Sequence, residues 1–180
     1  MDWLWQLDRE AYRLIHVEWR QDWLNHLMVA ITTTGLGWVQ AIALIPFLWL
    51  QTTRRAAIAV FVAGAGAGLL RILLVRLIDR QRPSNFAWST PLEDFFGHTS
   101  FPSGHTTTTF GIAFMLLLLC RETSRAWVGW LALVWACLVA TSRIVVGVHY
   151  PTDVLGAAML GCVAACLSWL VFERKGWLPA

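Results

Sequence analysis

Long runs of apolar residues, separated by short polar stretches, constrain the fold of this sequence most strongly. A lipid bilayer offers no hydrogen-bond partners to an exposed backbone, so such runs cross it as helices. Each run approaches the roughly 20 residues that a helix needs to span a hydrocarbon core of about 30 Å. The sequence therefore predicts an all-α integral membrane protein with a bundle of about five transmembrane helices, at residues 35–50, 56–78, 104–120, 126–146 and 153–172.

The composition agrees with this fold class and excludes several others. Hydrophobic residues make up 57% of the chain and charged residues 14%, whereas about a quarter of the residues of a soluble domain are charged. Such an apolar chain is not intrinsically disordered, and its length predicts a single domain over residues 1–180. The formal net charge is only +3 and the basic residues are scattered, so we expect no nucleic-acid partner. The sequence makes no prediction of the oligomeric state.

The first 23 residues lack a run long enough to span a membrane. They mix Trp, Leu and Ile with charges of both signs at helical spacing, which predicts an amphipathic interfacial helix over residues 1–23. Many of the twelve tryptophans lie at the edges of apolar runs, where the indole ring prefers the headgroup level of a membrane. The four cysteines lie inside apolar runs without the spacing of metal ligands, and we interpret them as buried hydrophobes.

Basic residues in short loops predict the orientation of the bundle. They occur at alternate loop ends, as Arg54 and Arg55, Arg121 and Arg125, and Arg174 and Lys175. By the positive-inside rule this side faces the cytoplasm, so the opposite side, which carries the loop at 84–101, is extracytoplasmic. The outer side also carries arginines, which are Arg71, Arg76, Arg80, Arg82 and Arg143. If these arginines have a chemical role, they do not count as signals of orientation.

Three polar clusters occur at the ends of the predicted spans. Polar residues are costly beside a bilayer, so clusters at span ends indicate a functional site. Consecutive spans alternate in direction, and we therefore expect all three clusters to meet at the same face. They are the segment 76–83, the segment 101–105 and the corner at 142–153.

Residues in these clusters have the chemistry of a phosphate-binding site. Arg82 and Arg143 carry planar guanidinium groups that suit phosphate oxygens. The segment 102–105 starts a helix, whose free backbone N–H groups and positive dipole end favour an anion. Gly104 lets a phosphate approach the backbone closely, and the Ser103 hydroxyl adds a donor. These residues predict a phosphate site that needs no metal.

Two histidines and an aspartate complete the predicted site. His149 and Asp153 are four residues apart at a helix start. The carboxylate can therefore fix one imidazole nitrogen and leave the other to attack phosphorus. His105 remains as a proton donor to the leaving group and, in a second step, as a base for water.

Other interpretations of these clusters stay open. His98, His105, His149 and Asp153 are metal-binding residue types, but they contain no compact ligand pair and the nearby arginines repel a cation. We therefore predict neither a metal nor another cofactor. A transporter or flippase for anionic lipids would use the arginines without hydrolysis. The aromatic loop at 84–99 is either a lid over the site or an interfacial anchor, and we assign it no catalytic role.

The three clusters resemble the signature of the type-2 phosphatidic acid phosphatase superfamily, membrane lipid phosphatases related to vanadium-dependent haloperoxidases. The second motif of that family, Pro-Ser-Gly-His, is complete at 102–105. The third, Ser-Arg, five residues, His, three residues, Asp, is complete from Ser142 to Asp153. The first motif, Lys, six residues, Arg-Pro, is incomplete, because Val75 stands at the lysine position. Arg76 lies one residue later, which turns its side chain by about 100° on a helix, so its replacement of the lysine needs its long stem or a local irregularity of the helix.

The resemblance implies the mechanism and the roles of the site residues. In such a phosphatase His149 attacks the terminal phosphate, Asp153 orients it and His105 protonates the leaving group. Water then hydrolyses the phosphohistidine. The phosphate oxygens would be held by Arg82, Ser103, Gly104 and Arg143, with Arg76 as a further candidate.

The resemblance also implies a substrate class. The chain is similar to the short bacterial undecaprenyl-pyrophosphate phosphatases in lacking the lysine, although many of these carry Asp at the position of Gly104. The leading expectation is hydrolysis of undecaprenyl pyrophosphate to undecaprenyl phosphate, in a bacterial cytoplasmic membrane and at a site facing the extracytoplasmic side. Phosphatidic acid and phosphatidylglycerol phosphate are the alternative substrates.

Overall fold

The computed structural model describes residues 2–93 and 99–178. Within these ranges the regular structure is helical, apart from one isolated β-bridge between Gln81 and Thr99. The elements are α1 (Asp2–Arg13), the π-helix η1 (Leu14–Glu18), α2 (Asp22–Thr34), α3 (Gly37–Trp49), α4 (Arg54–Val75), the 3-10 helix η2 (Pro83–Asn85), α5 (Gly104–Cys120), α6 (Ala126–Val145) and α7 (Pro151–Arg174). The predicted all-α membrane fold class is confirmed.

The predicted spans correspond closely to the long helices of the bundle. Among the described residues α4, α6 and α7 are long and apolar enough to cross a membrane, and α2 with α3 makes a fourth span when the pair is taken together. The apolar helix α5 has the predicted bounds but only 17 residues, the lower end of the range for a span. The predicted number of about five transmembrane spans is therefore reached only when α5 is counted as a span and α2 with α3 as another.

The first predicted span differs from the structure at its start. Sequence analysis places it at 35–50, whereas α3 has only 13 residues and is long and apolar enough for a span only when it is taken together with α2. The two helices meet at an angle of 60° around Gly35. A Cβ on Gly35 would lie 2.6 Å from the Val139 side chain, so the chain passes tightly against α6 at the bend. Residue 35 thus lies at the bend between two helices and does not begin a straight span.

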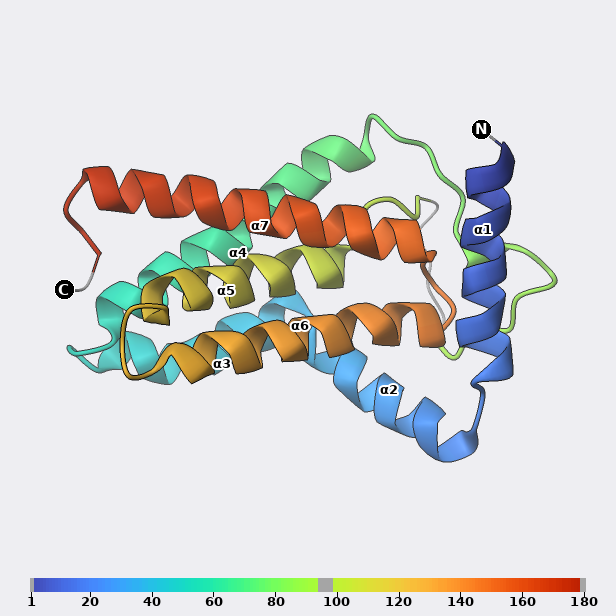
Figure 1. Ribbon diagram of the computed structural model, residues 1–180, viewed down its shortest axis with the longest axis horizontal. Helices are drawn as coiled ribbons and strands as arrows, with labels where there is room; N and C mark the ends of the chain where they lie inside the picture. Colours follow the sequence, from blue (N-terminus) through green and yellow to red (C-terminus); the bar gives the residue numbers. More distant parts are fainter. Residues whose placement is uncertain (1, 94–98, 179–180) are drawn as a thin grey trace.

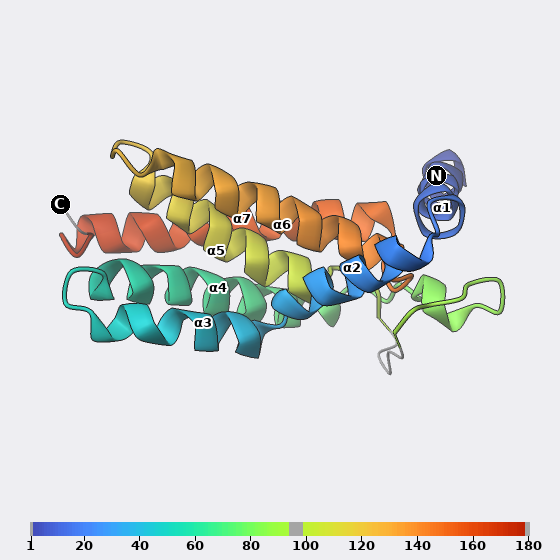
Figure 2. The same ribbon diagram turned by 90° about the horizontal axis from the view of Figure 1, so that it is seen from below.

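α5 lies at the centre of the bundle, where it packs against α4, α6 and α7 (Figures 1 and 2). Glycines permit the close approach of these helices. A Cβ on Gly161 of α7 would lie 2.5 Å from the Thr107 carbonyl oxygen of α5 and 2.8 Å from the Gly111 nitrogen. A Cβ on Gly129 of α6 would lie 2.5 Å from the Leu117 Cα. The start of α5 is therefore held among its neighbours by contacts between backbones.

α1 lies across one end of the bundle, roughly perpendicular to the long helices (Figure 1). Its buried face is polar and carries Asp8 and Tyr12, followed by His16 in η1. Trp3 and Leu7 are exposed on its other face, as expected for a helix at the membrane interface. The predicted amphipathic segment is confirmed, but its second half is the π-helix and the start of α2.

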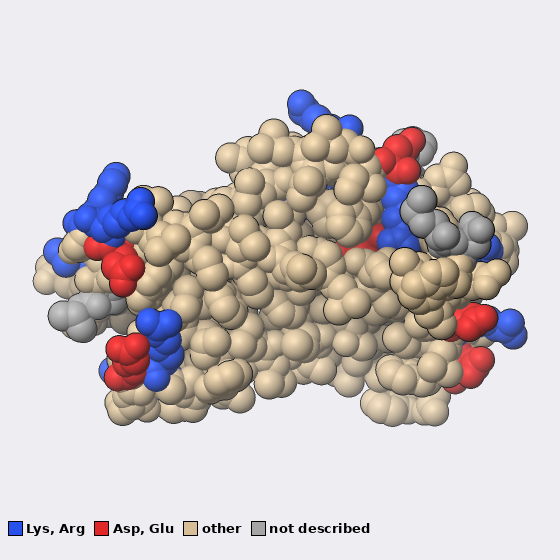
Figure 3. All heavy atoms as spheres, turned by 45° about the horizontal axis from the view of Figure 1, so that its top comes forward, with Lys and Arg blue, Asp and Glu red and all other residues tan. Residues whose placement is uncertain are grey.

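On the face drawn in Figure 3 charged side chains gather toward the two ends of the molecule, and the surface between them is largely uncharged apart from a basic group at the top edge. One end carries α1, the long connection between α4 and α5, and the corner between α6 and α7. The other end carries the turn between α3 and α4, the turn between α5 and α6, and the end of α7. All three predicted polar clusters therefore lie at the α1 end of this multi-pass membrane protein.

The close contact between α5 and α7 makes a testable prediction. We expect Gly161→Ala to destabilise the protein by about 1–3 kcal/mol, because the added methyl group would meet backbone atoms that cannot rotate away. Thermal unfolding in detergent measures this. Gly66→Ala is the matched control, because a Cβ at Gly66 has no heavy atom within 4 Å. Equal melting temperatures for the two variants would contradict the packing described here.

Candidate active site

A fully buried carboxylate, that of Asp153, organises the site. It lies in the first turn of α7 and accepts a hydrogen bond from the Tyr150 backbone N–H at 2.8 Å. A carboxylate at this position satisfies a free N–H at the start of its own helix. Ser100 and Arg80 also donate to it. These donors come from different segments, and together they fix the orientation of the carboxylate.

His149 lies between Asp153 and Arg82. Its Nδ1 is 3.6 Å from the Asp153 carboxylate, and its Nε2 is 3.1 Å from a terminal nitrogen of Arg82. Arginine only donates, so Nε2 accepts and the ring proton lies on Nδ1, toward Asp153. Burial lowers the pKa of His149 to about 3, although the Asp153 carboxylate opposes this shift. The imidazole is therefore neutral at neutral pH and keeps its lone pair on Nε2.

Two buried arginines concentrate positive charge beside His149. Arg82 and Arg143 are each 1% exposed. Burial, together with the positive charges of Arg143 and Arg71, lowers the pKa of Arg82 to about 10. Arg143 donates to the Thr32 hydroxyl and, at 3.1 Å, to the Glu93 carboxylate. Gathering like charges in a buried place is costly without an anion, so the arrangement suits a bound phosphate.

The start of α5 brings Ser103, Gly104 and His105 to the same cluster. Ser103 is the buried N-cap residue, and its backbone N–H donates to the Asp153 carbonyl oxygen at 3.4 Å. His105 lies within electrostatic range of His149 and of the buried arginines. A helix start presents free N–H groups to an anion. The cluster therefore combines a neutral imidazole, cations and N–H donors around one place.

Most of the predicted site residues come together in the fold. The residues that lie together at one end of the bundle are Arg82, Ser103, Gly104, His105, Arg143, His149 and Asp153. Arg76 does not join them. It is the exposed C-cap residue of α4, and within residues 2–93 and 99–178 its side chain makes no hydrogen bond or ion pair. This position does not support the replacement of the missing lysine by Arg76.

Sequence analysis missed a second group of polar residues that contacts the site residues. The Asp8 carboxylate of α1 accepts from Arg80, from the Thr152 backbone N–H at 2.9 Å and from the Thr152 hydroxyl at 2.6 Å. Arg80 thus bridges Asp8 and Asp153, and its guanidinium lies 4.5 Å from the ring centroids of both Trp5 and Tyr150. The four-residue spacing of Asp8 and Tyr12 on α1 and His16 in η1 is the signal that could have indicated a buried polar face.

The loop between α4 and α5 packs beneath α1. Tyr12 and Ser89 share a hydrogen bond of 2.7 Å, and the Leu92 backbone N–H donates to the Val146 carbonyl oxygen at 2.9 Å. Glu93 reaches Arg143, so the described part of this loop touches the site. His98, considered above as a metal ligand, lies outside the described residues.

Comparisons with known proteins agree with this geometry. The family profile of the PAP2 superfamily matches residues 55–177. A protein of Rhizobium johnstonii named lipid A 1-phosphatase is 37% identical over an alignment of 145 positions that covers 72% of this chain and 57% of that protein. An undecaprenyl-diphosphatase of Sulfolobus acidocaldarius is 34% identical over 152 residues, covering 83% of this chain and 68% of the relative.

A solved structure has the same fold over nearly the whole chain. It is the transmembrane PAP2-type phosphatidylglycerolphosphate phosphatase of Bacillus subtilis, with a TM-score of 0.82 and 26% sequence identity. The similarity covers 97% of this chain and 88% of that one. The match of the family profile over most of the chain, the relatives and the shared fold lead to one conclusion. The protein belongs to the PAP2 superfamily of phosphatases.

Proposed function

We propose that this PAP2 lipid phosphatase removes the terminal phosphate of undecaprenyl pyrophosphate through a phosphohistidine intermediate. The observation that carries the proposal is the neutral imidazole of His149, held between the Asp153 carboxylate and Arg82. In this arrangement the lone pair on Nε2 accepts a hydrogen bond from Arg82, and it is released for attack when Arg82 turns to the phosphate oxygens. It is the arrangement that a nucleophile needs for attack on phosphorus.

The reaction has two steps. In the first, Nε2 of His149 forms a bond to the terminal phosphorus while the bond from phosphorus to the leaving oxygen breaks, and His105 gives that oxygen a proton. The positive charge that develops on the imidazole is stabilised by Asp153. In the second, His105 takes a proton from water as the water oxygen attacks phosphorus. The N–P bond breaks, and inorganic phosphate is released.

The buried cations and the start of α5 stabilise the transition state. Negative charge on a transferring phosphoryl group gathers on its three equatorial oxygens. Arg82, Arg143 and the N–H groups near Ser103 and Gly104 are placed around His149 before substrate binds. Preorganised donors in a water-poor site need no reorientation during the reaction. They replace the charge compensation that a metal ion supplies in other phosphatases.

The identity of the lipid rests on the relatives. An undecaprenyl-diphosphatase is among them, which favours undecaprenyl pyrophosphate. Phosphatidylglycerol phosphate or phosphatidic acid is the alternative, favoured by the structural similarity to a phosphatidylglycerolphosphate phosphatase. An anionic-lipid flippase is a further alternative, which would need neither His149 nor His105 to react. Assays of these lipids side by side distinguish the substrates.

Substitution of the nucleophile tests the mechanism. We expect His149→Ala to lower phosphate release from undecaprenyl pyrophosphate by at least about 10³-fold, because no other group can form the intermediate. Purified protein in detergent with a chelator present gives the measurement. His26→Ala is the control, since His26 is exposed and bonds only to its own helix. Activity that survives in His149→Ala would contradict the mechanism, and loss of wild-type activity on chelation would contradict its independence of metal.

Asp8 and Arg80 act as positioning residues for Asp153. We expect Asp8→Asn to lower kcat by about 10- to 100-fold with little change in KM, because a released Arg80 no longer holds the carboxylate that orients His149. Steady-state kinetics over a pH series measure this. Glu10→Gln on the exposed face of α1 is the matched control, and Asp8→Glu should restore part of kcat. If activity falls only in proportion to the fraction of folded protein, Asp8 has a merely structural role.

The site faces the extracytoplasmic side in this proposal, in a bacterial cytoplasmic membrane. The support is the arginine-rich opposite end, which carries Arg54, Arg121 and Arg174. In a variant with the four native cysteines replaced by alanine, we expect Ala87→Cys to react with a membrane-impermeant thiol reagent in intact cells. Ser124→Cys, in the turn between α5 and α6, should react only after permeabilisation. The reverse pattern would place the site on the cytoplasmic side.

A further inference from the structure

We propose that Arg71 binds the second phosphate of a diphosphate lipid and so makes the enzyme prefer diphosphates to monophosphates. Arg71 belongs to none of the three polar clusters. It lies in the last third of the apolar helix α4, where a charged side chain needs a partner or a function. The inference rests on the proposed function, because it assigns a substrate class to the same site.

Arg71 lies against the start of α5. Its Nε donates to the Pro102 carbonyl oxygen at 3.3 Å. A Cβ on Gly104 would lie 3.6 Å from Arg71 Nε and 3.8 Å from its Cζ, so the glycine leaves the guanidinium close to the helix start. Within residues 2–93 and 99–178 this neutral carbonyl is its hydrogen-bond partner, and no carboxylate forms an ion pair with it. The remaining donors are available to an anion.

A cavity of about 510 Å³ joins Arg71 to the site. Its lining includes Gly35, Gly68, Arg71, Gly104 and His105. None of His149, Arg82 and Arg143 lines it. The cavity therefore meets the site at the side of His105, the residue that protonates the leaving group. The group that occupies this cavity is the part of the substrate that leaves.

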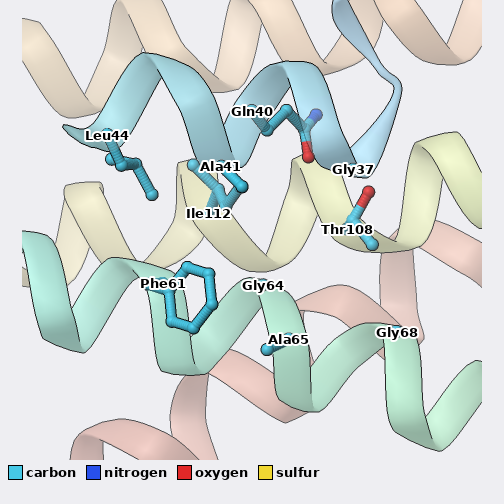
Figure 4. Close-up of a pocket in the computed structure, with 10 residues that line it drawn as sticks. All are labelled: Gly37, Gln40, Ala41, Leu44, Phe61, Gly64, Ala65, Gly68, Thr108 and Ile112. Atoms are coloured by element: carbon cyan, nitrogen blue, oxygen red, sulfur yellow. The ribbon is translucent and has the colours of Figure 1, made fainter.

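The cavity continues into an apolar crevice along the bundle. Figure 4 shows this crevice between α3, α4 and α5, with Phe61, Leu44 and Ile112 around it. Gly37, Ala65, Gly68 and Thr108 line both spaces. From His149 outward, the order is the transferred phosphate, His105, Arg71 and then an apolar path. A lipid chain on the far side of a second phosphate matches this order.

The charge of the leaving group makes Arg71 selective. Cleavage of a diphosphate leaves a phosphate on the lipid, and that phosphate carries negative charge beside Arg71. Cleavage of a phosphate monoester leaves an alcohol, which is neutral once His105 has protonated it. A charge-assisted bond from a guanidinium strengthens only in the first case. Arg71 therefore lowers the barrier for diphosphates and contributes little for monophosphates.

The test compares two substrates with the same lipid chain, undecaprenyl pyrophosphate and undecaprenyl phosphate. We expect Arg71→Gln to lower kcat/KM for the diphosphate by about 10- to 100-fold and that for the monophosphate by less than about 3-fold. The ratio of the two activities in one preparation does not depend on the folded fraction. Arg71→Lys should restore part of the diphosphate activity, and Arg76→Gln, the exposed neighbour on α4, should leave the ratio unchanged.

Several results separate this inference from the proposed function. Equal losses on both substrates in Arg71→Gln, with His149→Ala inactive, would overturn the role of Arg71 and leave the phosphatase mechanism standing. A wild-type enzyme that prefers the monophosphate would also overturn it. Full activity of His149→Ala on either substrate would instead contradict the proposed function itself.

Discussion

The burial of the Asp153 carboxylate is the constraint on which the rest of the site depends. A buried charge is costly unless several donors satisfy it. Here the donors come from the start of α7, from Ser100 and from Arg80, which α1 holds through Asp8. Segments far apart in the chain must therefore meet correctly before His149 faces a properly oriented carboxylate. The carboxylate that orders the local fold also lies against the imidazole that we propose as the nucleophile.

The interfacial helix α1 gains a clear role from this network. Its apolar face is exposed, as expected for contact with the membrane interface, while its buried face carries Asp8 and Tyr12 into the end of the bundle. The membrane-facing side of α1 and the positioning of Arg80 are thus linked through one short helix. The three arginines Arg71, Arg82 and Arg143 lie on the inner side of this arrangement, where Glu93 forms an ion pair with Arg143 and the charge of Asp153 acts on Arg82. In the proposed function the substrate phosphate adds negative charge to this group.

The sequence predicted the bundle and the meeting of the three polar clusters at one end of it, because both depend on local signals. Apolar length defined α4 to α7, and motif spacing at helix starts gathered His105, His149 and Asp153. The bend between α2 and α3 depends on packing against α6, which no local pattern shows. Asp8 meets Thr152 across 144 positions of the chain, so only the tertiary fold reveals it. Motif spacing pointed to Arg76, whereas the helix geometry places Arg71 beside the site.

The central claim, covalent catalysis by His149, is tested most directly by trapping the intermediate. Undecaprenyl pyrophosphate labelled in its terminal phosphate is mixed with the enzyme, quenched in alkali within one turnover and digested for mass spectrometry. The account predicts a phosphate that is stable to alkali, labile to acid and bound to the peptide that contains His149. Label on a different residue, or release of phosphate with none bound to the protein during the first turnover, would contradict it.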